Sequence, residues 1–126
     1  MMMTGEVSAL HEAVLRVVVR GPEGEEREVA AVVDTGFDGS LTLPPDLVAE
    51  LGLPFLVRGM ALLGDGSRSP FDAHEGMVLW NGQSRRISVE VADTEPLLGM
   101  SLMRGSELTI EIVEGGLVSI RELLQS

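Results

Sequence analysis

The apolar residues of this chain occur in short stretches, which glycines and other turn-forming residues separate. The stretch from Val29 to Val33 is typical, because it ends directly before an aspartate. Fifteen glycines and six prolines are spread along the 126 residues. Short segments rich in valine, leucine and isoleucine, bounded by turn residues, are typical of strands. The sequence therefore predicts an all-β domain with eight or nine strands.

Three polar, glycine-containing segments predict hairpins. Gly21 to Glu26 separates two apolar stretches, and Asn81-Gly82 is a dipeptide that favours the tight turn of a two-residue hairpin. Gly64 to Ser67 contains two glycines, which permit a tight and mobile hairpin tip. The strand before Asn81 is expected at residues 78–80, separate from one at residues 68–77.

Two short helices are expected where the spacing of the apolar residues changes. The segment from Pro44 to Gly52 begins with prolines, places its leucines on one face and ends at a glycine. The segment from Met100 to Arg104 has the length of one or two helical turns. Ser119 to Glu122 has the spacing of a capping box, so a terminal helix is a further expectation.

The length of the chain is enough for one modest core, and no linker indicates a boundary. We therefore expect a single domain over residues 1–126. A membrane-spanning helix needs about 20 apolar residues, which no stretch of this chain approaches. Residues 1–6 lack the basic flank and apolar core of a secretory signal, so a cytoplasmic location is expected, with no membrane partner.

Charge and composition argue against several classes of function. The formal net charge is -11, which is the wrong sign for a partner with a phosphate backbone, so no nucleic-acid partner is expected. The absence of cysteine excludes disulfides, a thiolate nucleophile and a zinc ribbon. The only histidines, His11 and His74, are far apart in sequence, so neither a metal site nor a cofactor is expected.

One motif lies where a strand is expected to end. Asp34-Thr35-Gly36 directly follows the apolar stretch 29–33, so the carboxylate is exposed at the strand end and the glycine lets the backbone turn beside it. Alone this tripeptide is weak evidence, because an aspartate at a turn or cap has the same appearance. Further along, Leu97-Leu98-Gly99 opens the expected helical turn at Met100.

In this combination the sequence resembles the retropepsin-like aspartic proteases of clan AA, in particular small prokaryotic members whose motif reads Asp-Thr-Gly-Phe. The resemblance covers roughly residues 14–120. It rests on the apolar strand, Asp34-Thr35-Gly36, the strand ending at Leu43-Pro44, the glycine-tipped hairpin and Leu97-Leu98-Gly99, in that order. It implies a closed β-barrel with one or two short helices and a flap hairpin.

The resemblance also implies a role for each residue of the motif. Asp34 would be the catalytic acid, Thr35 would bond across a two-fold axis, and Gly36 would leave room for substrate. The residues implied to bind a peptide or protein substrate are Phe37, Asp38, Gly64, Asp65, Gly66, Leu98 and Gly99. The protein would be an aspartic endopeptidase that acts as a homodimer.

The chemistry explains the homodimer. Hydrolysis without a metal or a covalent nucleophile needs a base that activates water and an acid that protonates the carbonyl oxygen. Two close carboxylates that share one proton supply both, as aspartic proteases illustrate. This chain has one such motif, because the nearest second candidate, Asp93-Thr94-Glu95, has a glutamate where the glycine should be. Two chains are therefore expected to contribute one Asp34 each.

Two positions depart from the family pattern. Phe37 replaces the small residue that usually follows Asp-Thr-Gly, so its ring must line a substrate pocket or join the core. Met100 replaces an arginine that in retroviral members pairs with an aspartate at the position of Asp38, and Arg104 is the candidate substitute. Two alternatives stay open: a non-catalytic peptide- or protein-binding module on the same fold, which Phe37 favours, and an unrelated acidic β-domain of a larger assembly.

Overall fold

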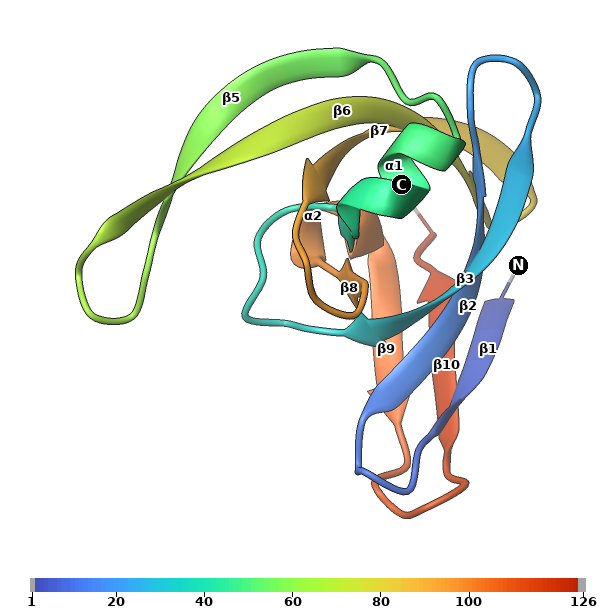
Figure 1. The fold of residues 1–126 in the computed structure, drawn as a ribbon. Coiled ribbons are helices and arrows are strands. Elements are labelled where there is room, and N and C mark those ends of the chain that lie inside the picture. Colours follow the sequence, from blue (N-terminus) through green and yellow to red (C-terminus); the bar gives the residue numbers. More distant parts are fainter. Residues whose placement is uncertain (1, 125–126) are drawn as a thin grey trace.

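The computed structural model describes residues 2–124, whose arrangement is shown in Figure 1. The described chain forms ten strands and two short helices. The strands are β1 (Met2–Val7), β2 (Ala13–Arg20), β3 (Glu26–Val33), β4 (Leu41–Leu43), β5 (Phe55–Leu62), β6 (Arg68–Trp80), β7 (Gln83–Val91), β8 (Leu97–Leu98), β9 (Ser106–Ile110) and β10 (Leu117–Glu122). The helices are α1 (Pro45–Glu50) and α2 (Met100–Met103), and neither is long and apolar enough to cross a membrane. The all-β class expected from the sequence is confirmed.

Part of the sheet closes on itself as a ring (Figure 1). Around the ring, β2 pairs with β3, β3 with β8, β8 with β4, β4 with β7, β7 with β6, and β6 returns to β2. The β3–β8 and β4–β7 pairs are parallel, and the other pairs are antiparallel. Because the two-residue strand β8 lies between β3 and β4, it joins the end of β3 to the start of β4.

The inner face of the ring forms the core. Successive side chains of a strand point to opposite faces, and in β2 Leu15, Val17 and Val19 are buried whereas Arg16 is exposed. Apolar side chains from the other strands and from the two helices pack against them. These include Val29, Ala31, Leu41, Leu43, Val48, Val78, Val89, Leu98, Leu102 and Ile120.

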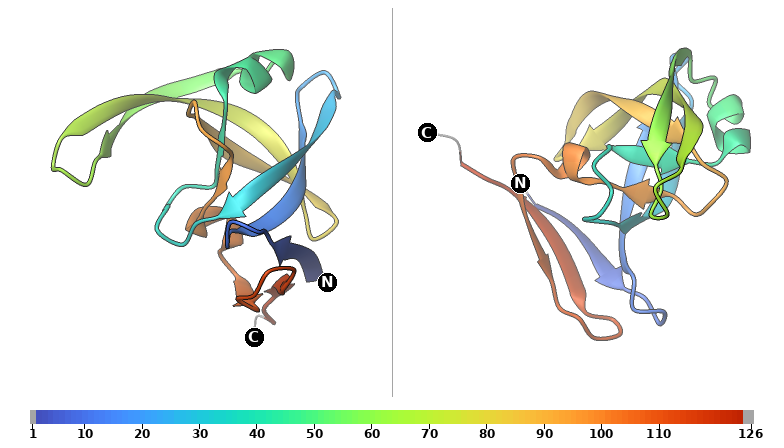
Figure 2. Two further views of the ribbon diagram at one scale, coloured as in Figure 1. Left: turned by 60° about the horizontal axis from the view of Figure 1, so that its bottom comes forward. Right: turned by 90° about the vertical axis from the view of Figure 1, so that its left-hand side faces the viewer.

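Two parts of the sheet extend beyond the ring. β5 and the first half of β6 form a long hairpin, which projects on the same side of the molecule as the connection between β3 and β4 (Figures 1 and 2). At the other end, β1 pairs with β10, and β10 pairs with β9. The hairpin and the β3–β4 connection contain the residues that the sequence singled out.

Several elements differ from the sequence-based expectation. β6 continues unbroken through residues 68–80, because it pairs with β5 along its first part and with β7 and β2 along its second. The turn after it has the expected positive φ values, 52° at Asn81 and 78° at Gly82. The expected terminal helix is wrong, because residues 117–122 pair with both β1 and β9 as a strand. β1 and the short β8 were not expected.

Candidate active site

Asp34 is the first residue after β3, where the chain leaves the ring toward β4. It is half-buried, whereas Thr35 and Gly36 are exposed. Its N–H donates to the carbonyl of Leu98 at 2.9 Å, and its Oδ1 accepts the N–H of Gly36 at 2.9 Å. The N–H of Phe37 donates to the carbonyl of Asp34 at 3.1 Å and closes the turn. Backbone groups therefore orient the carboxylate at the end of the strand.

The connection between β3 and β4 is held by the residues that open α2. The carbonyl groups of residues 37–40 each accept a hydrogen bond from this segment. The donors are the N–H of Met100 for Phe37 (2.8 Å), the hydroxyl of Ser101 for Asp38 (2.5 Å), the N–H of Ser101 for Gly39 (3.0 Å) and the N–H of Gly99 for Ser40 (2.9 Å). Satisfying consecutive backbone groups in this way fixes the shape of an exposed connection.

A buried threonine makes a further link between the two segments. Thr42 in β4 is only 6% exposed, and its Oγ1 accepts the N–H of Leu97 at 2.8 Å. The adjacent residue Leu41 pairs with Leu98 in β8. A side-chain oxygen thus extends the short ladder between β4 and β8 beyond the paired residues.

Phe37 is not a member of the buried core, because it is half-buried and its ring lies against two glycines. A Cβ at Gly39 would lie 2.5 Å from Cζ of Phe37, and a Cβ at Gly99 would lie 2.6 Å from its Cδ2. A side chain at Gly99 would also collide with the carbonyl of Gly39. Glycine is therefore required at both positions for the ring to lie over the connection beside Asp34.

The acidic residue after Phe37 has a different environment from the one expected. Among the residues described, no ion pair joins Arg104 to Asp38, so the expected substitution for the missing arginine is wrong. The carboxylate of Glu90 in β7 instead lies against Gly39, in the space that a side chain there would fill. Partial burial, with a smaller contribution from the charge of Asp38, raises the pKa of Glu90 above its ordinary value.

The tip of the β5–β6 hairpin is a tight polar turn. Gly66 has a φ of 87°, and its N–H donates to the carbonyl of Leu63 at 2.9 Å. The Oδ1 of Asp65 accepts bonds from the hydroxyl and the N–H of Ser67, at 2.6 and 2.9 Å, and these bonds lower the pKa of Asp65. Gly64 has open space where a side chain would be.

Apolar side chains flank this polar tip. Leu62, Leu63 and Met60 are 73%, 46% and 59% exposed. No hydrogen bond between described residues joins the tip to the β3–β4 connection. The hairpin stands out beside the Asp34 loop without closing on it (Figure 2).

A hollow of about 260 Å³ lies beside the Asp34 loop, and the two residues that precede Asp34 line part of it. Val32 and Val33 of β3 line one wall, and Ile110 and Ile112 line another. Ile112 is 75% exposed, and the neighbouring Val113 is 62% exposed. Six of the eight residues that line the hollow are apolar, and the other two are His11 and Glu12.

The structure joins some of the sequence-predicted residues and separates others. Leu98 and Gly99 contact the Asp34 loop, but the side chain of Leu98 is fully buried and its contribution is the carbonyl that holds Asp34. Gly64, Asp65 and Gly66 lie together on the separate hairpin. The residues that sequence reasoning missed are Thr42, Glu90 and Ser101. Only Ser101 carried a signal, as a hydroxyl two residues after Gly99 at the start of a helical turn.

Neither metal ligands nor known relatives assign a function to this site. Within residues 2–124, no three histidine, aspartate or glutamate side chains are grouped closely enough to hold a metal ion. The sequence matches no model of a known protein family and no curated protein.

Proposed function

We propose that the protein is an aspartic endopeptidase in which the Asp34 carboxylates of two identical chains form the catalytic pair. The observation that carries this proposal is the orientation of Asp34, whose carboxylate is held by the N–H of Gly36 directly after the end of β3. In this proposal the ring of strands is the closed barrel of a retropepsin-like fold, and the β5–β6 hairpin is its flap.

The proposed reaction needs both carboxylates. The ionised Asp34 of one chain takes a proton from water, whose oxygen attacks the carbonyl carbon of the peptide bond. The protonated Asp34 of the other chain donates its proton to the carbonyl oxygen. Collapse of the tetrahedral intermediate breaks the C–N bond, and the leaving nitrogen takes up a proton. The two titrations belong to the pair and not to either residue.

The apolar hollow beside the Asp34 loop supports the homodimer. A two-fold interface uses the same patch on both chains, and burying Ile110, Ile112, Val32 and Val33 removes apolar area from water. In this arrangement the exposed Thr35 is placed to bond with its counterpart across the axis.

The β5–β6 hairpin supports the flap assignment. Its tip contains two glycines, which lower the cost of changing backbone angles, and it projects on the side of the Asp34 loop (Figure 2). In the proposal, Gly64, Asp65 and Gly66 close over a peptide, while Phe37 and Asp38 contact it from the loop. Closure would exclude water from the reaction.

The experiment is hydrolysis of a broad peptide mixture, followed by mass spectrometry. Asp34→Asn removes the base and the shared proton, so the rate is expected to fall at least ~100-fold. Asp93→Asn makes the same chemical change in an exposed turn and should cleave like the wild type. A chelator should have no effect. Equal cleavage by wild type and Asp34→Asn would contradict the proposal.

A non-catalytic peptide-binding module is the second candidate, and one observation favours it. β5 is an edge strand of the sheet, and Phe55, Leu56 and Val57 are all about half exposed or more. An extended peptide can add to such an edge through main-chain hydrogen bonds. Peptide binding without cleavage by a stable dimer would support this candidate, and Phe37→Ala would then be the first variant to assay for activity.

A further inference from the structure

Two arginines that have no ion-pair partner among the described residues line the same pocket of this acidic protein. The chain contains nine arginines and no lysine. Among the described residues, the arginines in ion pairs are Arg16, Arg20, Arg27, Arg58, Arg86 and Arg121. Of the others, Arg68 lies on the β5–β6 hairpin, whereas Arg85 and Arg104 line one pocket.

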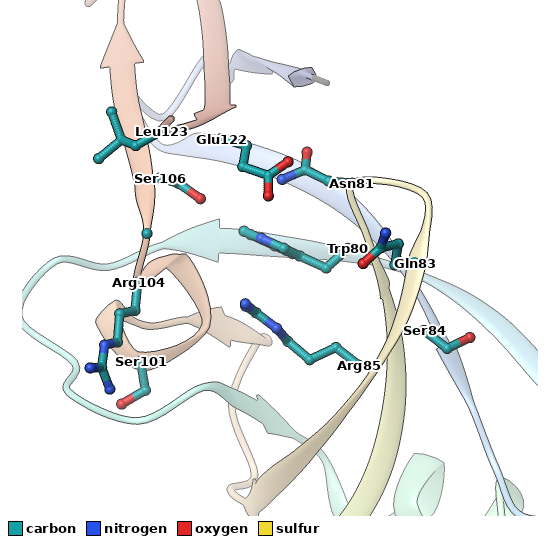
Figure 3. A pocket seen from close by; sticks show the side chains of 11 residues that line it. Trp80, Asn81, Gln83, Ser84, Arg85, Ser101, Arg104, Ser106, Glu122 and Leu123 are labelled. Atoms are coloured by element: carbon teal, nitrogen blue, oxygen red, sulfur yellow. The ribbon is translucent and has the colours of Figure 1, made fainter. Parts of the chain in front are cut away.

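The pocket has a volume of about 520 Å³ and is formed by three parts of the chain (Figure 3). The turn between β6 and β7 forms one side, α2 and the start of β9 form another, and the end of β10 forms the third. The N–H of Leu123 donates to the carbonyl of Gly105 at 2.9 Å and ties the second part to the third.

Arg85 is held in place within the pocket. Its Nη1 donates to the carbonyl of Leu102 in α2 at 2.8 Å, which leaves its other N–H groups for a ligand. The side chain extends beside the ring of Trp80, which is 5% exposed and forms an apolar wall (Figure 3). The hydroxyl group of Ser106 is a further donor in the lining (Figure 3).

One carboxylate, that of Glu122, also lines the pocket and affects its local charge. Glu122 lies on the other side of the Trp80 ring from Arg85 (Figure 3) and pairs with neither arginine. Two guanidinium groups against one carboxylate leave this pocket locally positive on a chain whose formal charge is -11.

We propose that this pocket binds an oxyanion, the phosphate or carboxylate group of a small molecule, through Arg85 and Arg104. The planar fork of a guanidinium matches the geometry of both groups and binds them through charge-assisted hydrogen bonds. The apolar wall at Trp80 is next to the bound group and contacts the part of the ligand that carries it. The proposal does not rest on the proposed protease function, because Arg85, Arg104 and Trp80 lie outside the Asp34 loop and the hairpin, although Ser101 of the pocket lining also bonds to that loop.

The chain contains its own reporter for this experiment, because Trp80 is its only tryptophan. Tryptophan fluorescence is followed during titration with sodium phosphate or sodium acetate, at an ionic strength held constant with sodium chloride. Saturable binding of either anion above the chloride background is expected. A preference for phosphate would assign a phosphorylated ligand, and a preference for acetate a carboxylate.

Two variants are expected to change the affinity in opposite directions, and a third is a control. Arg104→Gln should weaken binding about tenfold or more, because it removes a charge-assisted hydrogen bond, and Glu122→Gln should tighten it about twofold to fivefold. Arg68→Gln removes an unpaired arginine far from the pocket in the fold and should bind like the wild type. Circular dichroism of each variant checks that it is folded. Equal affinity in Arg104→Gln, Arg68→Gln and wild type, or no binding above chloride, would overturn the proposal.

Discussion

At the scale of single residues, Glu90 is a carboxyl group near the Asp34 loop whose surroundings disfavour ionisation. Partial burial and the nearby charge of Asp38 both disfavour its ionised form, so its pKa is raised. A carboxyl group with a raised pKa in the folded state favours folding while it is protonated. That contribution is complete below the ordinary carboxyl pKa and is lost as the pH rises through the raised value.

Glu90→Gln is therefore expected to raise the free energy of unfolding at neutral pH. The gain should be less than about 1 kcal/mol, because water still screens the half-buried group, and it should disappear below about pH 4. Urea unfolding at both pH values measures it. In an Asp38→Asn background the gain should be smaller. The same gain at both pH values would show that packing, not charge, is responsible.

At the scale of elements, the sequence predicts local structure well and long-range pairing poorly. The hairpins around Gly21 to Glu26 and Gly64 to Ser67, and both helices, were predicted because their turn residues are local signals. β8 has only two residues and pairs with strands that lie more than fifty positions earlier. Its sequence, Leu97-Leu98, has no property that specifies those partners. The end of β10 was assigned to a helix because Ser119 to Glu122 has a capping-box spacing, which carries no information about its pairing with β1 and β9.

The short pairing of β4 with β8 is expected to depend on the side chain of Thr42. Thr42→Val keeps the shape but removes the acceptor of the Leu97 N–H, so that N–H is left without its bond. The expected loss is about 1–3 kcal/mol in the free energy of unfolding, measured by urea titration. Thr109→Val makes the same change at an exposed position of β9 and should cost little. Equal effects in the two variants would contradict the role of the Thr42 hydroxyl.

At the scale of the whole molecule, only the part of the candidate site that lies in one continuous segment could be predicted from the sequence. Asp34-Thr35-Gly36 is continuous in the sequence and was singled out there. The bonds from Ser101 to the same loop, and the contact of Phe37 with Gly99, join residues more than sixty positions apart. The pocket between Arg85 and Arg104 likewise exists only because β7 and α2 meet in the fold. No local sequence pattern predicts which distant segments come into contact in the fold.

Net charge also acts on the whole molecule, and it makes the proposed homodimer sensitive to salt in a defined direction. Two chains with a formal charge of -11 repel each other, and the two Asp34 carboxylates would meet at the axis. Raising the ionic strength from 0.01 M to 0.1 M shortens the screening length from about 30 Å to about 10 Å. Salt should therefore tighten dimerisation, measured by sedimentation equilibrium. Asp34→Asn should tighten it at low salt, because it removes the negative charge that the pair carries at the axis. Near pH 4, where many carboxyl groups are protonated, the salt effect should shrink. A dimer that salt weakens would instead be held by ion pairs, and a chain that stays monomeric under all these conditions would remove the basis for a shared catalytic pair.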